Sequence, residues 1–480
     1  MNILGMGIDY TTGNLLCEAI DDQIAGRETV RALYRAHDRL LALTTVPRDV
    51  ALLREKARRL PSPDYGDPRA AGWTYLLAAD DPARAAITEI IQPLARHRGM
   101  PHPEAPLIYA RGAEEDWWRW IEHNYVTRDL TRPPFYVLII GDPDHVPFRF
   151  QALLQTIAAT GRLHFDSPDD LQSYVTKVLR LENAPEPAVE REAIFFAPQL
   201  PPRGLDHDAT YYSRRFLAEP IARLVGCEYG FVPHVLSGDR ATKEALLATM
   251  RATRPALVFV ASHGMVAPAE PPDVQRRVNG AICCQHNRDE PRERWLLSAA
   301  DIARDQYILD GAILFQFTCF GYGTPARSEY AHWTPLLEEL NTDTDFIAAL
   351  PQRLLALPHG PVGFIGHVDA AWVCGFHDEG QASDNEHWEA RVAPFAMTVR
   401  HLLHDLQPAG QAMAPIGQRY VALNSNLADD IDRLRRGDIY ETPDFRAKQA
   451  QAYILRNDAQ NYMVFGDPAV QLQVPATASG

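Results

Sequence analysis

Two apolar segments of this sequence each end on a residue that can take part in nucleophilic chemistry. PALVFVASHG (255–264) delivers His263 followed by Gly264, and GAILFQFTC (311–319) delivers Cys319. A neutral imidazole beside a thiol can accept the thiol proton and hold a thiolate, the species that attacks a carbonyl carbon. Because Gly264 has no side chain, its backbone N–H can approach the oxyanion that forms, and we expect the Cys319 N–H to be the second donor. The sequence therefore predicts a Cys–His dyad with an oxyanion site at Gly264.

The same residues also allow a structural interpretation. A single histidine at a strand end is more often a hydrogen-bonded structural residue, and a cysteine in an apolar run is more often inert. Both residues follow predicted strands and stand near glycines, which favours catalysis because reactive groups of parallel sheets collect at carboxyl ends of strands. Gly321 and Gly323 should let the chain leave the strand sharply and keep the sulfur exposed. Rival motifs are missing, since the sequence has no GxSxG elbow, no HExxH and no P-loop lysine motif.

Composition and charge limit the classes of protein to which this chain can belong. The net charge of −15 over 480 residues argues against a nucleic-acid or anionic-membrane surface, because no basic stripe offsets it. The N-terminus lacks the cationic start and apolar run of a secretory signal, and no segment reaches the roughly 18 apolar residues of a membrane helix. The six cysteines include no CxxC pair, which suits reduced thiols better than disulfides or a zinc site. We therefore expect a cytoplasmic protein with reduced cysteines, and the sequence leaves open whether it holds a structural metal ion.

Strands and helices alternate along most of the chain, which predicts parallel sheets with crossover helices. The expected strands are 75–80, 106–110, 135–142, 191–198, 229–236, 255–264, 280–285, 311–319, 361–369 and 462–474. The expected helices are 82–98, 113–125, 167–182, 208–226, 241–253, 391–406 and much of 415–460. A polar, proline-rich excursion covers 265–280.

This pattern predicts three regions. Residues 1–72 show helical periodicity across 30–60 before the breaker cluster PSPDYGDP, which indicates a helical N-terminal extension. Residues 73–183 should form an α/β subdomain without catalytic residues, and the linker NAPEPAVE separates it from a catalytic subdomain at 191–475. The expected fold class is α/β, with two successive three-layer subdomains of mainly parallel sheets.

Several motifs resemble those of the gingipain-type cysteine peptidases, within the caspase-like clan, and they occur in the same order. YVLIIGDPDHVPF is similar to the family's strand–GD–(I/V)P segment, and TGRLHFDSPDDLQSYVTKVLRLE to its GR and acidic-helix segment. ASHG and FTCFGYG stand where the family has its catalytic His-Gly and Cys, close to the roughly 50-residue spacing of the caspase order. FIGHVDAAW and VFGDPAVQL resemble a strand that ends before a tryptophan and the closing FGDP strand. The resemblance spans about 73–475.

The resemblance implies a pair of subdomains, of which the second carries a caspase-like sheet and the dyad His263/Cys319. It also implies hydrolysis of peptide bonds in protein or peptide substrates through a thioester, with no metal ion or other cofactor in the chemistry. Trp372 matches the tryptophan that helps to wall the primary specificity pocket. The segment RFQALLQTIAA lacks the acid that selects arginine in the arginine-specific relatives, and the signal and prosegment of secreted relatives are not evident.

The acidic chain favours substrates with a basic side chain before the scissile bond. Asp142, Asp144 and Asp369 all follow predicted strands, and a desolvated basic side chain needs an opposite charge. Asp369 is a candidate for that charge, although a helix cap or a loop acid is the commoner role for such a residue.

Three functions stay open from the sequence. The leading hypothesis is a cytoplasmic caspase-like endopeptidase, and the alternatives are a catalytically idle binding module with the same fold and a thiol amidase. Because an unrestrained cytoplasmic peptidase would digest its host, we expect a zymogen with an upstream protease as a candidate partner, as in a bacterial stress or antiviral response. The candidate latch is 265–298, which should be exposed and mobile, and the alternative is a surface loop that only shapes the substrate cleft. Its candidate cutting points are Arg276, Arg277, Arg288, Arg292 and Arg294.

Overall fold

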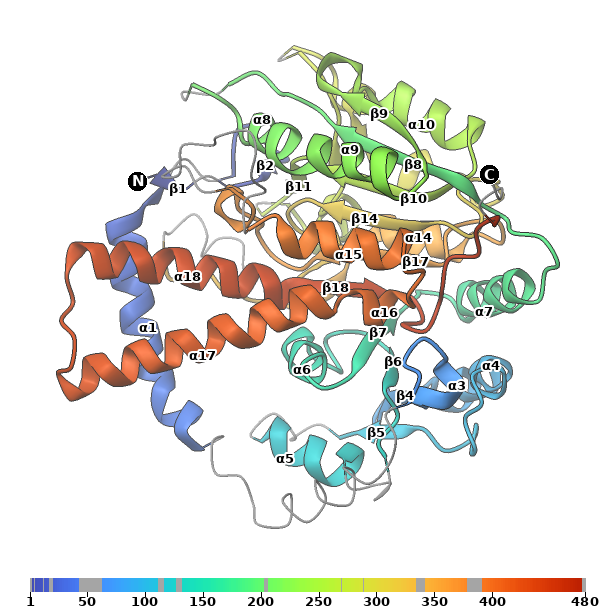
Figure 1. The fold of residues 1–480 in the computed structure, drawn as a ribbon, viewed down its shortest axis with the longest axis horizontal. Helices are drawn as coiled ribbons and strands as arrows, with labels where there is room; N and C mark the ends of the chain where they lie inside the picture. The colour runs from blue at the N-terminus through green and yellow to red at the C-terminus, as the bar shows by residue number, and fades with distance from the viewer. Residues whose placement is uncertain are drawn as a thin grey trace.

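A ten-stranded sheet runs through the molecule and sets the positions of the other elements (Figure 1). The structure is a computed structural model, and it describes residues 2–3, 5–11, 13–16, 20–42, 63–110, 116–126, 132–202, 206–268, 270–287, 289–333, 342–377 and 391–476. In spatial order the strands are β5 (Leu107–Tyr109), β4 (Trp73–Ala78), β6 (Tyr136–Ile140), β7 (Ala159–Leu163), β18 (Tyr462–Phe465), β17 (Gly363–His367), β14 (Ile313–Phe317), β10 (Pro255–Ala261), β8 (Glu190–Ala197) and β9 (Val232–Ser237).

The direction of the strands reverses once, between β17 and β18. The strands from β5 to β18 run parallel to one another, and so do those from β17 to β9. β17 and β18 pair antiparallel, with His367 opposite Tyr462. The carboxyl ends of β10, β14 and β17 therefore meet at one edge of the sheet, and those of β4, β6 and β7 lie at the opposite edge. The expected α/β fold with mainly parallel strands is confirmed, and its two parallel halves form one continuous sheet.

The central strands are apolar because helices cover both faces of the sheet. Every residue of β6 (YVLII), β10 (PALVFVA) and β14 (ILFQF) is buried. The polar amide residue among them is Gln316, whose side-chain N–H donates to the Gly280 carbonyl at 2.8 Å, whereas its Oε1 has no hydrogen-bond partner among the described residues. These strands are rigid supports for the loops that follow them.

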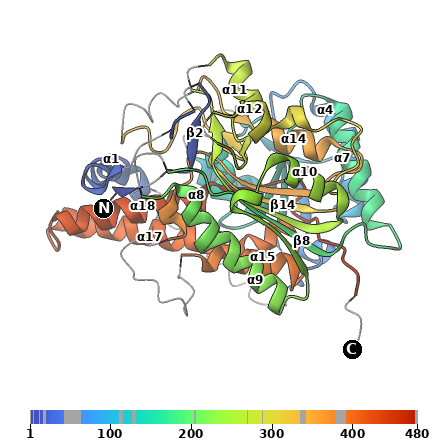
Figure 2. The ribbon, with the colours of Figure 1, turned by 90° about the horizontal axis from the view of Figure 1, so that it is seen from above.

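The main covering helices lie in two layers. Their bounds are α4 (Arg84–His97), α6 (Phe148–Leu154), α7 (Pro168–Glu182), α9 (Glu219–Glu228), α10 (Lys243–Ala252), α14 (Ala349–Ala356) and α15 (Ala393–Leu403), and shorter helices are α3 (Pro68–Ala71), α5 (Trp117–Ile121) and α16 (Ala409–Ala412). Figure 2 shows α7, α10 and α14 on one side of the sheet and α9 and α15 on the other. α7 is capped by Ser167, whose hydroxyl accepts from the Asp169 N–H. None of the described helices is both long enough and apolar enough to span a membrane.

Three long helices stand beside the sheet (Figure 1). They are α1 (Asp22–Ala42), α17 (Ala414–Arg436) and α18 (Pro443–Asn461). α1 confirms the expected helix as far as residue 42, whereas 43–62 lie outside the described residues. Before α1 the chain forms short strands that the helical periodicity did not predict, among them the antiparallel pair β1 (Asn2–Ile3) and β3 (Ile20–Asp21). The domain boundaries stay predictions.

The chain after His263 forms a second, four-stranded sheet. In spatial order its strands are β13 (Leu296–Leu297), β12 (Ile282–Cys283), β11 (Gly264–Val266) and β2 (Gly7–Asp9). β11, β12 and β13 are buried, so the expectation that 265–298 is an exposed, mobile loop is wrong for these strands. α11 (Pro272–Val278) and α12 (Arg292–Trp295) connect them and carry the exposed Arg276, Arg277 and Arg294, whereas Arg288 lies outside the described residues. A two-stranded sheet, β15 (Gly323–Thr324) with β16 (Phe346–Ile347), completes the fold.

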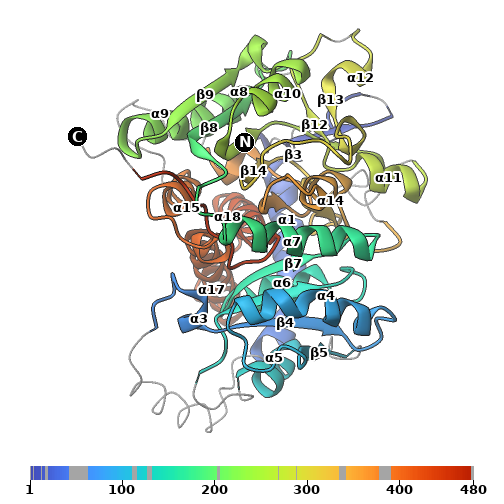
Figure 3. The ribbon, with the colours of Figure 1, turned by 90° about the vertical axis from the view of Figure 1, so that its right-hand side faces the viewer.

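A buried carboxylate joins the end of the main sheet to its helices. Asp467, just after β18, accepts from Trp73 Nε1 at 2.9 Å and from Arg98 Nε at 2.7 Å. The Arg98 guanidinium also donates to both carboxylate oxygens of Glu182, at 2.6 and 2.7 Å. Arg98 follows α4 and Glu182 ends α7, and Figure 3 shows these helices side by side. The aspartate of the FGDP motif therefore has a structural role.

Replacing Asp467 by alanine should destabilise the fold. The change leaves the buried Arg98 guanidinium without one of its two counter-charges, and breaking a buried ion pair costs about 3–5 kcal/mol. Urea unfolding followed by circular dichroism measures the loss in free energy of unfolding. Asp273→Ala is the matched control, because Asp273 pairs with Arg277 at the surface, where a pair contributes about 1 kcal/mol or less. Equal losses in the two variants would contradict this role for Asp467.

Candidate active site

The parallel pairing of β10 with β14 brings His263 and Cys319 to the same edge of the sheet. Ala261 stands opposite Phe317 in the register, and the Ser262 N–H donates to the Phe317 carbonyl at 3.1 Å. His263 and Cys319 each lie two residues beyond this matched pair. A Cβ placed on Gly264 would be 1.9 Å from the Cys319 carbonyl oxygen, so the two loops touch backbone to backbone. This contact explains why position 264 is glycine.

His263 is held by a buried carboxylate. Its Nε2 lies 3.0 and 3.2 Å from the two carboxylate oxygens of Asp208, and both side chains are fully buried. Because Nε2 faces an acceptor, it carries the ring proton, and the lone pair is left on Nδ1. Nδ1 is buried and has no hydrogen-bond partner among the described residues. The arrangement leaves one nitrogen of His263 able to accept a proton.

Asp208 is a site residue that the sequence did not single out. It is the cap of α8 (Ala209–Tyr212), where its carboxylate accepts from the backbone N–H and the hydroxyl of Thr210. Burial alone would raise the pKa of Asp208, but the His263 imidazole and the Thr210 donors hold that pKa below its ordinary value. The available signal was an aspartate opening the predicted helix 208–226, and such a residue is indistinguishable in sequence from an ordinary helix cap.

Cys319 points its sulfur into the protein. The Ala371 N–H donates to Sγ at 3.1 Å, and the Cys319 thiol faces the Ala371 carbonyl at 3.6 Å. Burial raises the pKa of the thiol well above its ordinary value, although backbone amides of Ala371 and Met6 partly offset this rise. The side chain is 0% exposed, so the expectation of an exposed sulfur is wrong.

The turn after Cys319 is made by an unexpected residue. Phe320 takes the left-handed conformation with φ of 57°, and its N–H donates to the Asp369 carbonyl at 2.8 Å. Gly321 and Gly323 are required by close packing instead: a Cβ at Gly321 would lie 2.6 Å from the Thr318 hydroxyl, and one at Gly323 would lie 2.5 Å from the Phe346 carbonyl. Gly321 and Gly323 thus allow neighbouring segments of the chain to pack closely against this turn.

Asp369 shapes the loop that faces Cys319. It also has a positive φ, 84°, and it is buried. Its carboxylate accepts from the Ser328 hydroxyl and the Ala370 N–H at 2.8 Å and from the Glu329 N–H at 2.7 Å. Burial raises its pKa to about 6. These three donors occupy the carboxylate that was expected to bind a basic substrate side chain.

Asp144 and Trp372 have different relations to the dyad. Asp144 is exposed in the turn after β6, whose carboxyl end lies at the edge of the sheet opposite to that of β10 and β14. Asp142 lies in the same turn and is half-buried. Trp372 directly follows Ala371, which contacts Sγ, and its buried ring packs against Tyr330 and Trp333 with centroids 5.0 and 5.6 Å apart. The structure brings Trp372 next to Cys319, whereas no hydrogen bond or ion pair among the described residues links Asp144 to His263 or Cys319.

The N-terminal segment covers the sulfur. β2 pairs parallel with β11, with Gly7 opposite Gly264. A Cβ placed on Gly7 would be 3.5 Å from Cys319 Sγ. The sequence did not predict this contact, since the two segments lie at distant positions in the chain.

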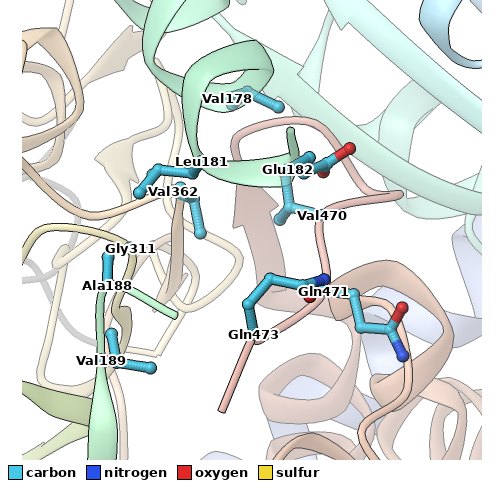
Figure 4. Close-up of a pocket in the computed structure, with 10 residues that line it drawn as sticks. All are labelled: Val178, Leu181, Glu182, Ala188, Val189, Gly311, Val362, Val470, Gln471 and Gln473. Carbon is cyan, nitrogen blue, oxygen red and sulfur yellow. The ribbon is translucent and has the colours of Figure 1, made fainter. Parts of the chain in front are cut away.

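Other features of the fold lie away from this site. The apolar crevice in Figure 4 is lined by residues of α7 and of the C-terminal segment, together with Gly311 and Val362. Gly311 and Val362 precede β14 and β17, so the crevice lies at the edge opposite to Cys319. Among the described residues, no three His, Cys, Asp or Glu side chains converge in a way that could hold a metal ion.

Iodoacetamide should distinguish the thiols of the folded chain. Cys227 is exposed, whereas Cys319 is buried with a raised pKa, so we expect Cys227 to be alkylated at least about tenfold faster. Peptide mapping by mass spectrometry at increasing times measures both rates, and the chain unfolded in guanidinium is the control in which the rates should converge. A Cys319 that reacts first in the folded chain would contradict the burial described here.

Comparison with known proteins finds similarity only at the level of structure. No protein-family model matches the sequence, and no curated protein matches it. Similar solved structures include the complex of Porphyromonas gingivalis RgpB pro- and mature domains (11% identity, TM-score 0.46, covering 83% of this chain and 80% of that chain). Another is the Arg-specific cysteine proteinase gingipain R (13%, 0.45, 86% and 80%). The Saccharomyces cerevisiae separase–securin complex is more distant (11%, 0.31, 72% of this chain and 16% of that chain).

Proposed function

We propose that this chain is a caspase-like cysteine peptidase in which Cys319 is the nucleophile and His263 is the base. The observation that carries the proposal is the buried Asp208–His263 pair at the loop that touches Cys319. A carboxylate bonded to one imidazole nitrogen leaves the other free to take a proton, which is the requirement for activating a thiol. A buried histidine with a purely structural role would be expected to form hydrogen bonds through both ring nitrogens.

The proposed reaction proceeds through a thioester. His263 takes the Cys319 thiol proton at Nδ1, and the thiolate attacks the carbonyl carbon of the scissile peptide bond. The negative charge that develops on the carbonyl oxygen is stabilised by the Gly264 and Cys319 backbone N–H groups. When the carbon–nitrogen bond breaks, His263 returns the proton to the leaving amine. A water molecule, deprotonated by His263, then hydrolyses the thioester and releases the acid and the thiol.

Asp208 acts in this scheme as a positioning residue. It fixes the ring orientation and the tautomer of His263, and its charge stabilises the imidazolium that forms. Trp372 is proposed to border the substrate cleft, because it adjoins Ala371 beside the sulfur. The substrates are proteins or peptides. Cytoplasmic location and activation by an upstream protease stay predictions, and Asp144 and Asp369 are given no role in binding the substrate.

Cys319→Ala and Cys319→Ser should each abolish hydrolysis of a mixed fluorogenic peptide library. Neither a methyl group nor an unactivated hydroxyl replaces the thiolate as nucleophile. Cys227→Ser is the matched control, since its thiol is exposed and distant in sequence from the dyad, and it should retain the wild-type rate. Library hydrolysis that survives in Cys319→Ala would refute the proposal.

Asp208→Asn should separate catalysis from stability. Asparagine caps a helix about as well as aspartate, so the free energy of unfolding should change by less than about 1 kcal/mol. The catalytic rate should nevertheless fall by about 10²-fold or more with KM nearly unchanged, because the charge that orients and stabilises His263 is lost. Asp208→Ala should lose the cap as well, at a cost of about 0.5–2 kcal/mol. Steady-state kinetics and urea unfolding provide both readouts, and an active Asp208→Asn enzyme would exclude the positioning role.

A further inference from the structure

The segment 5–9 crosses the candidate active site in an extended conformation. On one side it pairs antiparallel with the loop after β17, where Gly5 bridges Trp372 and the Met6 N–H donates to the Ala371 carbonyl at 3.0 Å. On the other side it pairs parallel with β11, as Gly7 does with Gly264. Addition of an extended strand to a sheet edge is a common way for proteins to bind peptides.

The position of Met6 relative to the proposed catalytic groups is specific. The Met6 carbonyl oxygen accepts from the Gly264 N–H at 3.1 Å, which is the donor proposed for the oxyanion. The sulfur of Cys319 lies beside the next residue, since a Cβ on Gly7 would be 3.5 Å from it. The peptide bond between Met6 and Gly7 therefore lies between the proposed nucleophile and the proposed oxyanion donor.

We propose that residues 5–9 are a resident peptide ligand of the substrate cleft, with Met6 in the place of the residue before the scissile bond. The cleft is accordingly selective for an uncharged, unbranched apolar side chain at that place. The proposal rests on the proposed function in one respect, which is that the cleft is the one that binds the substrate. The binding of residues 5–9 in that cleft does not depend on catalysis.

The surroundings of Met6 support this selectivity. Its side chain is 0% exposed and belongs to the main apolar core. Asp369, the acid closest in sequence to the pairing loop, already accepts three hydrogen bonds from the protein. Asp458, the other buried acid whose charge acts on Cys319, faces His367 Nε2 at 3.3 Å. Both carboxylates are thus already engaged by the protein, and burying a lysine or arginine without a counter-charge of its own is costly. The structure therefore favours methionine-like side chains over the basic ones expected from the sequence.

The segment is held by the sheet that follows His263. Beyond β2, the Arg292 guanidinium donates to the Thr11 carbonyl at 3.0 Å and lies 4.5 Å from the centre of the Tyr10 ring. The 265–298 segment thus restrains the bound strand. With the strand in place, the thiol is shielded and burial keeps it protonated, so an external peptide reaches it only during the time that the strand is out of the cleft.

Displacing the segment should expose Cys319. Met6→Asp places an unpaired charge in the apolar core, and deletion of residues 2–10 removes the strand outright. In both variants iodoacetamide should alkylate Cys319 at least about tenfold faster than in the unchanged chain, while the rate at Cys284, which is buried directly after β12 of the small sheet, should not change. Unchanged Cys319 reactivity would overturn the proposal, and so would an equal rise at Cys319 and Cys284, because it would indicate loosening of the sheet.

Binding in trans tests the selectivity without any need for catalysis. The chain that lacks residues 2–10 and carries Cys319→Ala should bind a synthetic peptide of residues 2–10 in isothermal titration calorimetry. The same peptide with arginine in place of Met6 should bind at least about tenfold more weakly, because its charge has no partner in the cleft. No binding of the Met6 peptide, or equal binding of the two, would overturn the inference. If the Met6 peptide binds but the deletion chain with Cys319 intact hydrolyses no peptide, the proposed function fails and this inference stands.

Discussion

The contact between the backbones of Gly264 and Cys319 is the constraint around which this molecule is arranged. Two parallel strands, β10 and β14, end in register, and the loops after them approach so closely that no side chain fits at position 264. Because the strands are buried and fully apolar apart from Gln316, they cannot slide without exposing core residues to water. The relative position of His263 and Cys319 is therefore set by the sheet, and loop flexibility has little influence on it.

The loops beside this contact hold strained backbone. Phe320 and Asp369 both have positive φ values, and such non-glycine residues cost about 1–3 kcal/mol each. A hydrogen bond from the Phe320 N–H to the Asp369 carbonyl joins them, and the Asp369 carboxylate gathers three donors from its own surroundings. Strain of this kind persists only where neighbouring contacts over-determine it. The conformation of these two residues directs the chain so that Ala371 faces the sulfur of Cys319 and the Trp372 ring packs against Tyr330 and Trp333.

The packing around β18 accounts for two sequence motifs that take no part in the proposed reaction. Gly161 in β7 must be glycine because a Cβ there would lie 2.3 Å from the Gly466 carbonyl oxygen. The neighbouring Arg162 is buried, and its guanidinium donates to the Gln151 side chain and the Gly141 carbonyl. These residues belong to the GR and FGDP segments, and they pack β7 against β18, the strand that pairs antiparallel with β17 on its other side. These segments therefore have a structural role in the sheet, independently of any reaction.

The sequence by itself determined most strands of the main sheet, most of the helices and the positions of His263 and Cys319 at strand ends, because apolar runs and helix caps are local signals. It did not predict β7, whose Gly161 and Arg162 interrupt the apolar pattern, or the pairing of β2 with β11. Asp208 resembled an ordinary helix cap, and the sulfur of Cys319 was expected to be exposed. Asp142 and Asp144 follow a strand that runs opposite to β10 and β14, because β17 and β18 pair antiparallel, and nothing local in the sequence shows this reversal. Only the tertiary structure decided these points, since the direction of a strand in a sheet and the segment that covers a side chain depend on pairing between residues far apart in the chain.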